Sequence, residues 1–454
     1  MTATNTNEET PKEQLTDDIS FEKVRALEEA VELNKLAALK AKQQAKQQEG
    51  KMAAKIVAKK ERSLNLGIIG SGQAGSRIAE AFFKQGYDAI AINTAIQDLK
   101  FINIPDSNKL LLQFGVGGTS KEIGLGKAAA EMHKGEILEL INDKLSNSQV
   151  NIFCTSAGGG SGAGSSEIII ELLAELGKPL VVIAALPMAN EDPHTKQNSL
   201  ETLSTLTNFI KSKKVSNLIL IDNAKLEAIY HNVNQMDFYE VSNNAIVQTL
   251  DAFNSYSAMA SSVKSLDPME FSKLLIDSEG LTTFGELTVA NYEEDTAIAE
   301  AIVNSLSNNL LASNFDLTQS KYVGFLMVAN KEVWSKIPSS SINYASSMIA
   351  DVSGNPKGIF KGVYVSESPE NVVKVYSIFS GLGLPAARVE ELKKETTELQ
   401  NKIKGKDDQR NLSIQLNNSV NETATAAQKI KEKIASKSST FGKFVAGGTS
   451  DRRK

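Results

Sequence analysis

Two glycine-rich loops have the residue types and spacing best suited to chemistry. One of them, CTSAGGGSGAGSSEIII, joins an apolar run to a helical pattern. Closely spaced backbone amides without Cβ atoms form a cradle for an anion, and a serine hydroxyl adds a donor. A flexible linker would not be confined between a buried strand and an amphipathic helix. We therefore predict a phosphate-binding loop that contains Gly158, Gly159, Gly160, Ser161, Gly162 and Gly164.

The other loop, IIGSGQAGSRIAEAF, carries Gly70, Gly72 and Gly75 in the GxGxxG pattern between a strand and a helix. Such a loop brings amides and a helix N-terminus to a phosphate, but it also occurs in ordinary tight turns. In a dinucleotide-binding fold an acidic residue ends the second strand. Here that strand ends in Asn93 and Thr94, which disfavours a dehydrogenase. A Walker A loop, GxxxxGK[ST], is absent, which disfavours P-loop enzymes.

The elements that must position these loops begin at residue 63. Short apolar runs alternate with helical patterns, and this alternation predicts an α/β domain over 63–235 with a parallel sheet covered on both faces. The predicted strands are LNLGIIG, AIAINT, KLLLQF, VNIFCTSA, PLVVIAALP and NLILID. The predicted helices between them are SRIAEAFFKQG, KEIGLGKAAAEMHKGEILELINDKL, EIIIELLAELG and SLETLSTLTNFIKSK.

A long central helix is predicted over 236–264. A second, smaller α+β domain follows over 265–385, with the strands FGELTVA, YVGFLMVA, GIFKGVYVS and VKVYSIFSG. The chain ends differ in composition: 1–62 predicts a charged helical extension, and 386–454 predicts an amphipathic helix with a flexible tail from Gly405. The tail closes on a basic tip, which suits an acidic partner protein or a DNA-bound adaptor, although a solvated end without a role fits equally well.

The composition limits the classes of function. The formal net charge is -5, which disfavours wholesale nucleic-acid binding by a basic surface. One cysteine and three histidines disfavour disulfides and metal centres built from these residues. The most apolar stretch, EIIIELLAELGKPLVVIAALP, is interrupted by charges and a turn, so we expect no membrane span. Together these features favour a cytoplasmic protein.

Several motifs in order resemble the tubulin/FtsZ family. AGGGSGAG resembles the signature loop of that family, IGSGQAG its first nucleotide loop, AINTAIQDL its second, QFGVGGTSKEIG the loop that senses the γ-phosphate, and LIDNAKL a later segment. The likeness covers about Leu64 to Glu270. It implies a GTPase with GTP or GDP in the crevice at the strand ends, and Mg²⁺ held mainly by phosphate oxygens and waters.

The resemblance also implies the phosphate contacts. Gly70, Gly72, Gln73, Ala74 and Gly75 belong to the first loop, and Asn93 and Thr94 would lie beside the phosphates and Mg²⁺. Gly117, Gly118 and Thr119 would close over the γ-phosphate, and the segment from Gly158 to Gly164, with Ala163, would hold the diphosphate.

Four residues are implied at the nucleoside. Glu191 matches the ribose-contacting Glu of the family, whereas Thr195 stands near the place where bacterial members often have Arg. Asn223 can supply an amide to the guanine edge. Tyr239 and Asn243 are four residues apart on one helical face, where a ring can stack on the base and an amide can meet its edge. Asn244 is the alternative register for Asn243.

The segment SLDPMEF resembles the catalytic loop of the family, with Asp267 and Glu270 as the carboxylates and Ser265 in place of Asn. In the family this loop docks on the next subunit and polarises the attacking water. The same residues also fit a helix cap. The resemblance thus implies a filament of head-to-tail subunits. The N-terminal helix and the basic tail tip are unlike a standard division protein, which favours a divergent bacterial, plasmid- or phage-type filament for positioning DNA or particles; the alternatives are a division-ring protein and a nucleotide-binding adaptor that does not polymerise.

Overall fold

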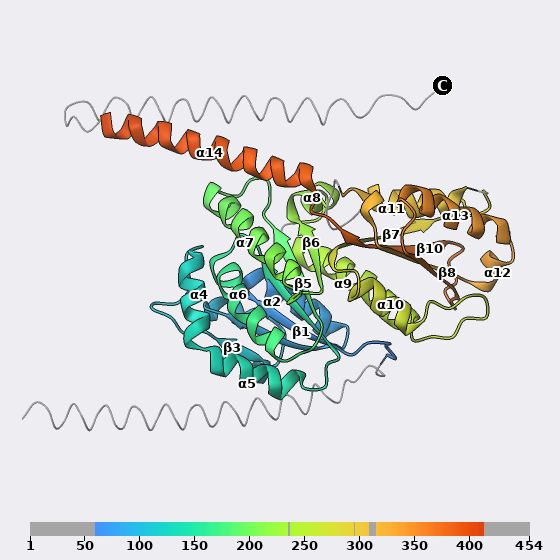
Figure 1. Cartoon of the computed structure of the whole chain (residues 1–454), viewed down its shortest axis with the longest axis horizontal. Coiled ribbons are helices and arrows are strands. Elements are labelled where there is room, and N and C mark those ends of the chain that lie inside the picture. Colours follow the sequence, from blue (N-terminus) through green and yellow to red (C-terminus); the bar gives the residue numbers. More distant parts are fainter. Residues whose placement is uncertain (1–59, 235–236, 295, 308–314, 413–454) are drawn as a thin grey trace, which may run out of the picture. The chain divides into compact units, whose positions relative to one another are not determined.

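The computed structural model describes residues 60–234, 237–294, 296–307 and 315–412 (Figure 1). Its first compact unit extends through Lys393, and a second begins at Lys394. One ten-stranded sheet crosses the first unit in the order β3-β2-β1-β4-β5-β6-β7-β10-β8-β9. This architecture confirms the α/β prediction. Within the described ranges, no helix has the length and apolar character needed to cross a bilayer.

The first six strands are parallel and follow the order 3-2-1-4-5-6. Both faces are buried, which explains their continuous apolar runs: Ile68 and Ile69, neighbours in β1, enter different core clusters. The strands are β1 (Leu66–Ser71), β2 (Asp88–Asn93), β3 (Lys109–Leu111), β4 (Val150–Ser156), β5 (Leu180–Leu186) and β6 (Asn217–Asp222).

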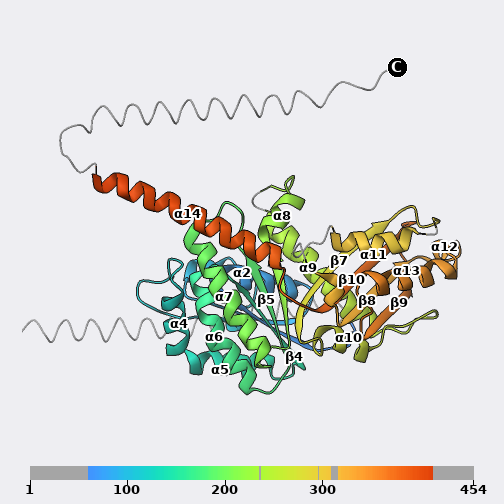
Figure 2. The ribbon, with the colours of Figure 1, turned by 45° about the horizontal axis from the view of Figure 1, so that its top comes forward.

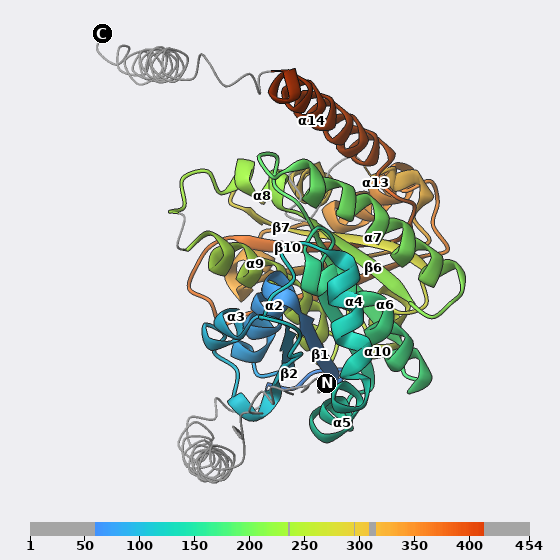
Figure 3. The ribbon, with the colours of Figure 1, turned by 90° about the vertical axis from the view of Figure 1, so that its left-hand side faces the viewer.

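Helices cover the two faces of this parallel half (Figure 3). One face carries α2 (Gly72–Lys84), α3 (Ile96–Lys100) and α9 (Phe238–Tyr256). The other carries α4 (Ile123–Met132), α5 (Lys134–Leu145), α6 (Gly160–Glu175) and α7 (Pro193–Lys211). The short helix α8 (Asn223–Ile229) follows β6, and a 3-10 turn, η1 (Asp106–Asn108), precedes β3.

The remaining strands extend the same sheet rather than forming a separate one (Figure 2). They are β7 (Gly280–Val289), β8 (Tyr322–Ala329), β9 (Gly358–Val365) and β10 (Val373–Leu382). β7 pairs in parallel with β6, where the buried Asn217 amide donates to Thr282 Oγ1 at 2.6 Å. The helices of this half are α10 (Pro268–Leu275), α11 (Ala297–Ser307), α12 (Lys331–Trp334) and α13 (Ser339–Val352), with η2 (Leu317–Gln319) before β8.

Three expected boundaries are wrong. The central helix α9 ends at Tyr256 rather than near residue 264, because the following segment SAMASSVKS has no apolar stripe to pack and Ser257 Oγ bonds back to the Phe253 carbonyl at 2.6 Å. The helical pattern over 121–145 is two helices, α4 and α5, which meet at His133. The last helix, α14 (Ala386–Leu412), continues past Gly405, where a flexible tail was expected.

The predicted N-terminal extension lies outside the described residues up to residue 59. Its last residues are held on α9: Lys60 Nζ and Arg62 Nε donate to the buried Asp251 carboxylate at 2.7 and 2.8 Å. Burial opposes ionisation of Asp251, but the hydrogen bonds from Lys60, Arg62 and Tyr87 outweigh it and lower the pKa of its carboxyl. The chain therefore enters the fold through an ionic anchor on the central helix.

Candidate nucleotide-binding site

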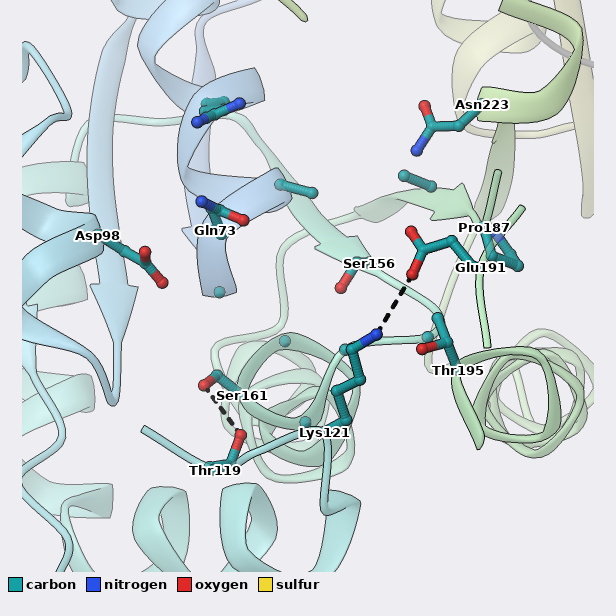
Figure 4. Close-up of a pocket in the computed structure, with 18 of the residues that line it drawn as sticks. Gln73, Asp98, Thr119, Lys121, Ser156, Ser161, Pro187, Glu191, Thr195 and Asn223 are labelled. Atoms are coloured by element: carbon teal, nitrogen blue, oxygen red, sulfur yellow. Dashed lines mark hydrogen bonds and ion pairs between the residues drawn. The ribbon is translucent and has the colours of Figure 1, made fainter. Parts of the chain in front are cut away.

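A cavity of about 380 Å³ opens at the carboxyl ends of the parallel strands (Figure 4). The loops after β1, β4, β5 and β6 line it, together with α9 and the loop before α4. Strands β1 and β4 are parallel neighbours, and the order in which successive strands join the sheet reverses between them. From β1 the chain adds β2 and β3 toward one edge, and from β4 it adds β5 and β6 toward the other. Such a switch point is where open α/β sheets bind ligands.

Two helices begin at this cavity without side-chain caps. Ser71 precedes α2 and Gly159 precedes α6, and neither helix receives a side-chain hydrogen bond at its cap. The first amides of each helix therefore lack intrahelical partners and carry the positive end of the helix dipole. The two uncapped N-termini make this end of the cavity suitable for an anion such as a polyphosphate.

The glycines here are required by close approach. Gly72 has a φ of +70°, and a Cβ on it would lie 2.8 Å from the Gly162 amide nitrogen, so the two glycine loops touch. A Cβ on Gly160 would lie 2.3 Å from Thr119 Oγ1 and 2.8 Å from the Lys121 carbonyl carbon. A side chain at these positions would separate the loops and fill the cradle.

Hydroxyl groups connect the loops around the cradle. Ser161 Oγ, at the start of α6, contacts the hydroxyls of Thr94 and Thr119, the latter at 3.3 Å. The Gly118 amide donates to the Thr94 carbonyl at 3.0 Å. The loop predicted to sense the γ-phosphate is thus bonded to the segment after β2 and to the cradle.

The opposite end of the cavity combines an aromatic ring, two amides and a carboxylate. Tyr239 and Asn243 face it from α9, and Asn223 faces it from the start of α8. Burial raises the pKa of Tyr239, and the nearby Glu191 carboxylate raises it further. Asn243 lines this cavity, whereas Asn244 faces a neighbouring hollow. A ring, amides and a carboxylate of this kind are suited to a base and a ribose.

Fourteen of the predicted ligand residues line the cavity: Gly72, Gln73, Ala74, Gly118, Thr119, Gly158, Gly159, Gly160, Ser161, Gly162, Glu191, Asn223, Tyr239 and Asn243. Their individual contacts with a nucleotide stay predictions.

Of the other predicted ligand residues, Gly117 is exposed and the rest are buried outside the cavity lining. Asn93, 1% exposed, donates to Asp98 and accepts from the Ala95 amide. Close packing against a neighbour explains two of the buried glycines: a Cβ on Gly75 would lie 2.1 Å from the Cys154 carbonyl oxygen, and one on Gly164 would lie 2.4 Å from the Ile123 oxygen. The residues outside the cavity lining are Gly70, Gly75, Asn93, Thr94, Gly117, Ala163 and Gly164.

Several lining residues were missed. Arg77 comes from the first turns of α2 and lies 5.0 Å from the Tyr239 ring centroid. Asp98 points in from α3, and Lys121 and Thr195 come from the loop before α4 and from α7. Arg77, Asp98 and Lys121 each stand inside one of the quoted stretches IIGSGQAGSRIAEAF, AINTAIQDL and QFGVGGTSKEIG, so the charged residues of these stretches were the available signal.

The predicted catalytic carboxylates lie outside this cavity. Asp267 precedes α10 and is exposed, and Glu270 is half-buried. They form a capping box: the Glu270 amide donates to Asp267 Oδ1 at 2.8 Å, and the Asp267 amide donates to Glu270 Oε2 at 3.0 Å. The predicted helix cap is therefore confirmed, and it holds both carboxylates on a surface outside this subunit's own cavity.

Comparisons with known proteins agree with this architecture. The model of the tubulin/FtsZ family GTPase domain matches residues 65–231, and the model of the TubZ-like C-terminal domain matches residues 253–393. The chain belongs to the tubulin/FtsZ family of GTP-binding filament proteins.

The sequence relatives are tubulin-like proteins. The chain is 28% identical to the tubulin-like protein CetZ of Pyrococcus abyssi over 324 residues, which covers 69% of this chain and 85% of that protein. It is 24% identical to the tubulin-like protein TubZ of Bacillus cereus over 366 residues, or 74% and 83% of the two chains.

A solved structure with the same fold is the GTPγS-form protofilament of TubZ from Bacillus thuringiensis serovar israelensis. Its TM-score is 0.68 at 21% identity, covering 76% of this chain and 95% of that one. A helical model of the two-stranded TubZ-Bt filament gives a TM-score of 0.70 at 21% identity, over 80% of this chain and 95% of that one.

Proposed function

We propose that this protein binds GTP and hydrolyses it while it assembles head to tail into a cytoplasmic filament. One observation carries the proposal. Two uncapped helix N-termini meet across touching glycine loops at one end of a cavity whose other end holds Tyr239, Asn223 and Asn243. A nucleoside polyphosphate fits both ends at once, because its phosphates suit the helix N-termini and its base suits the ring and the amides.

The residues have distinct roles in this proposal. The amides of the α2 and α6 N-termini hold the phosphates, and Ser161 and Thr119 add hydroxyl donors. Glu191 bonds the ribose, and Tyr239 stacks on the guanine. Asn223 and Asn243 bond the edge of the base. GDP would occupy the same positions without the contacts to the loop of Gly117 to Thr119.

Mg²⁺ would accompany the phosphates. The described residues contain no group of three or more His, Cys, Asp or Glu that could hold a metal by itself. Asp98 is the cavity-lining acid that lies near the Thr94 segment, and it would orient waters on a phosphate-bound Mg²⁺. Phosphate oxygens and waters would supply most of the ligands, and the ion would neutralise phosphate charge.

Hydrolysis would be completed between subunits. Asp267 and Glu270 lie on a surface outside the cavity of their own subunit, so they would serve the nucleotide of a neighbour. The neighbour's Glu270 would position and deprotonate the attacking water. An interface between unlike surfaces of identical subunits gives an open polymer when its rotation does not close into a ring, so turnover would be linked to assembly.

Positioning of DNA or particles is the cellular task that we propose, with an adaptor or DNA-bound partner recruited through the C-terminal tail. A structural neighbour, the type III plasmid segregation protein TubZ, has a TM-score of 0.65 at 19% identity, and its name supports this choice. The TubZ-like match over 253–393 favours it over a division-ring protein.

Right-angle light scattering with GTP and with GDP, combined with phosphate release over a range of protein concentrations, tests the function. We expect scattering to rise with GTP alone, and release per subunit to increase steeply above a threshold concentration. Negative-stain microscopy of the same samples should show filaments. GTP binding without scattering or filaments would instead support an adaptor that does not polymerise.

A further inference from the structure

Lys121 brings a positive charge into the cavity from the loop that borders the glycine cradle. Among the residues that line the described cavity, Arg77 and Lys121 are the cations, and Asp98 and Glu191 are the acids. Arg77 is occupied at the other end, where its guanidinium packs over the Tyr239 ring. Of these two cations, Lys121 is therefore the one whose backbone borders the glycine cradle in which a polyphosphate would lie.

The backbone of Lys121 is fixed directly against the cradle. The buried Asn198 side chain, on α7, donates both to the Lys121 carbonyl oxygen at 2.7 Å and to the Gly158 carbonyl oxygen at 3.2 Å. Gly160 leaves room for this approach, because a Cβ there would lie 2.8 Å from the Lys121 carbonyl carbon. One amide group thus joins the lysine to the phosphate loop.

The conformation of this short segment is unusual. Ser120 and Lys121 both have positive φ, at 46° and 69°, a region that residues other than glycine adopt at a cost. The Glu122 amide closes the turn on the Thr119 carbonyl at 2.8 Å. A turn that is held by a buried amide fixes the direction of the Cα–Cβ bond, and in the structure the Lys121 side chain extends from it across the cavity (Figure 4).

In the structure the Lys121 ammonium pairs with two acids at the beginning of α7. It lies 3.4 Å from Glu191 Oε2 and bonds Asp192 Oδ2. The hydrogen bond to Asp192 raises the pKa of the ammonium, so Lys121 is charged at neutral pH. Both pairs are exposed, with 46% of the Lys121 side chain and 44% of the Asp192 side chain accessible, so each is weak and exchangeable.

We infer that Lys121 distinguishes triphosphate from diphosphate: its ammonium leaves Asp192 to contact the terminal phosphate of bound GTP. The inference rests on the proposed GTP binding and identifies the residue that reads the nucleotide state. A terminal phosphate offers more negative charge than one exposed carboxylate and also accepts charge-assisted hydrogen bonds. Asp192 caps α7, so its release from Lys121 would carry the signal to that helix.

Calorimetric titration with GTPγS and with GDP tests this inference, on dilute protein that shows no light scattering. For Lys121→Met we expect the Kd for GTPγS to rise about tenfold or more, as for loss of a hydrogen bond to a charged group. The Kd for GDP should change less than about twofold. The matched control is Lys127→Met, which removes an exposed lysine on α4 that pairs with Glu167 outside the cavity and should leave both constants unchanged.

Asp192→Asn is the reciprocal variant. Asparagine keeps the cap on the Thr195 amide but loses the charge that competes for Lys121. We expect it to bind GTPγS more tightly by roughly two- to fivefold, the range for removing an exposed ion pair. This variant also decides the question if Lys121→Met does not fold.

Three results would overturn the inference: equal weakening of both nucleotides by Lys121→Met, no change in either, or unaltered GTPγS binding by Asp192→Asn. A wild-type chain that binds neither nucleotide would instead overturn the proposed function itself, so the two failures are distinguishable.

Discussion

Arg388 holds the carboxylate of Asp222, the residue immediately before the base-facing Asn223. Its Nε lies 2.7 Å from Asp222 Oδ2 and its Nη2 lies 3.2 Å from Oδ1, and the two side chains are only 4% and 2% exposed. Asp222 also caps α8 by accepting from the Ala224 amide. The start of α14 is therefore bonded to the end of the strand that presents Asn223.

Arg388→Met should reduce the free energy of unfolding by about 3–5 kcal/mol, because it removes the guanidinium that is hydrogen-bonded to the buried Asp222 carboxylate. The double variant Arg388→Met/Asp222→Asn should recover part of this loss. Lys127→Met, which breaks the exposed pair with Glu167, should cost no more than about 1 kcal/mol. Urea unfolding followed by circular dichroism measures all three, and equal effects of Arg388→Met and Lys127→Met would show that the buried pair has no special weight.

Gly162→Val should abolish measurable GTP binding, with a loss of at least about a hundredfold. A Cβ at this position lies 2.9 Å from Thr155 Oγ1 and 3.0 Å from the Ser71 carbonyl oxygen, and the branched side chain would fill the cradle. Gly135→Ala is the control, since its Cβ has no neighbour within 4 Å. Fluorescent nucleotide titration gives both affinities, and unchanged binding by Gly162→Val would remove the cradle from the site.

Glu270→Gln separates catalysis from capping. Glutamine at this position retains the reciprocal hydrogen bond to the Asp267 amide, so we expect stability to be nearly unchanged. Phosphate release should fall about a hundredfold, the usual loss when an acid–base group is removed. GTP binding should persist, and filaments formed with GTP should last longer.

Glu270→Ala is the comparison variant, because it removes both the carboxylate and the cap. It should lose a further ~1 kcal/mol of stability. Normal phosphate release from Glu270→Gln, measured above the concentration at which scattering begins, would rule out the catalytic role.

His133 should make stability depend on pH. Its hydrogen bond to the Gln113 carbonyl, together with the nearby Glu136, raises the folded-state pKa above the ordinary value of 6.5. The extra stability should be fully present below about pH 6.5 and should disappear as the pH rises through the folded-state pKa. Unfolding of the wild type and of His133→Gln at pH 5.5 and 8.5 should show a larger difference at the lower pH; a larger difference at pH 8.5 would contradict the assignment.

Deletion of 413–454 should leave GTP hydrolysis nearly intact and abolish recruitment of the tail's partner. The cut belongs after Leu412 because α14 continues to that residue, beyond the Gly405 boundary expected from composition. Phosphate release and light scattering check the first part. If the truncated protein does not assemble, the deleted segment belongs to the filament interface and the tether hypothesis is wrong.

The strands were predictable because each contains a short run of apolar residues, most clearly LVVIAAL in β5. The junction of β6 with β7 was not, because the pairing of Asn217 with Gly280 has no local sequence signal. The end of α9 and the break at His133 depend on which side chains find tertiary partners, which helix propensity does not encode.

In the candidate site, glycine spacing predicted the loops and their neighbourhood. It could not separate glycines that face the cavity, such as Gly72, from those that allow close packing behind it, such as Gly75. Lys121 was missed because its role depends on a positive φ and on Asn198, which lies 77 residues away in the chain.

The buried Cys154 makes the protein convenient for site-specific labelling. It is the single cysteine of the sequence, it is fully buried in β4, and burial raises the pKa of its thiol. A thiolate is the species that reacts with maleimides, so this sulfur should be inert in the folded protein. A cysteine introduced on an exposed surface would then be the site that a maleimide fluorophore labels in the folded protein. Slow modification of Cys154 itself would measure how often the sheet opens.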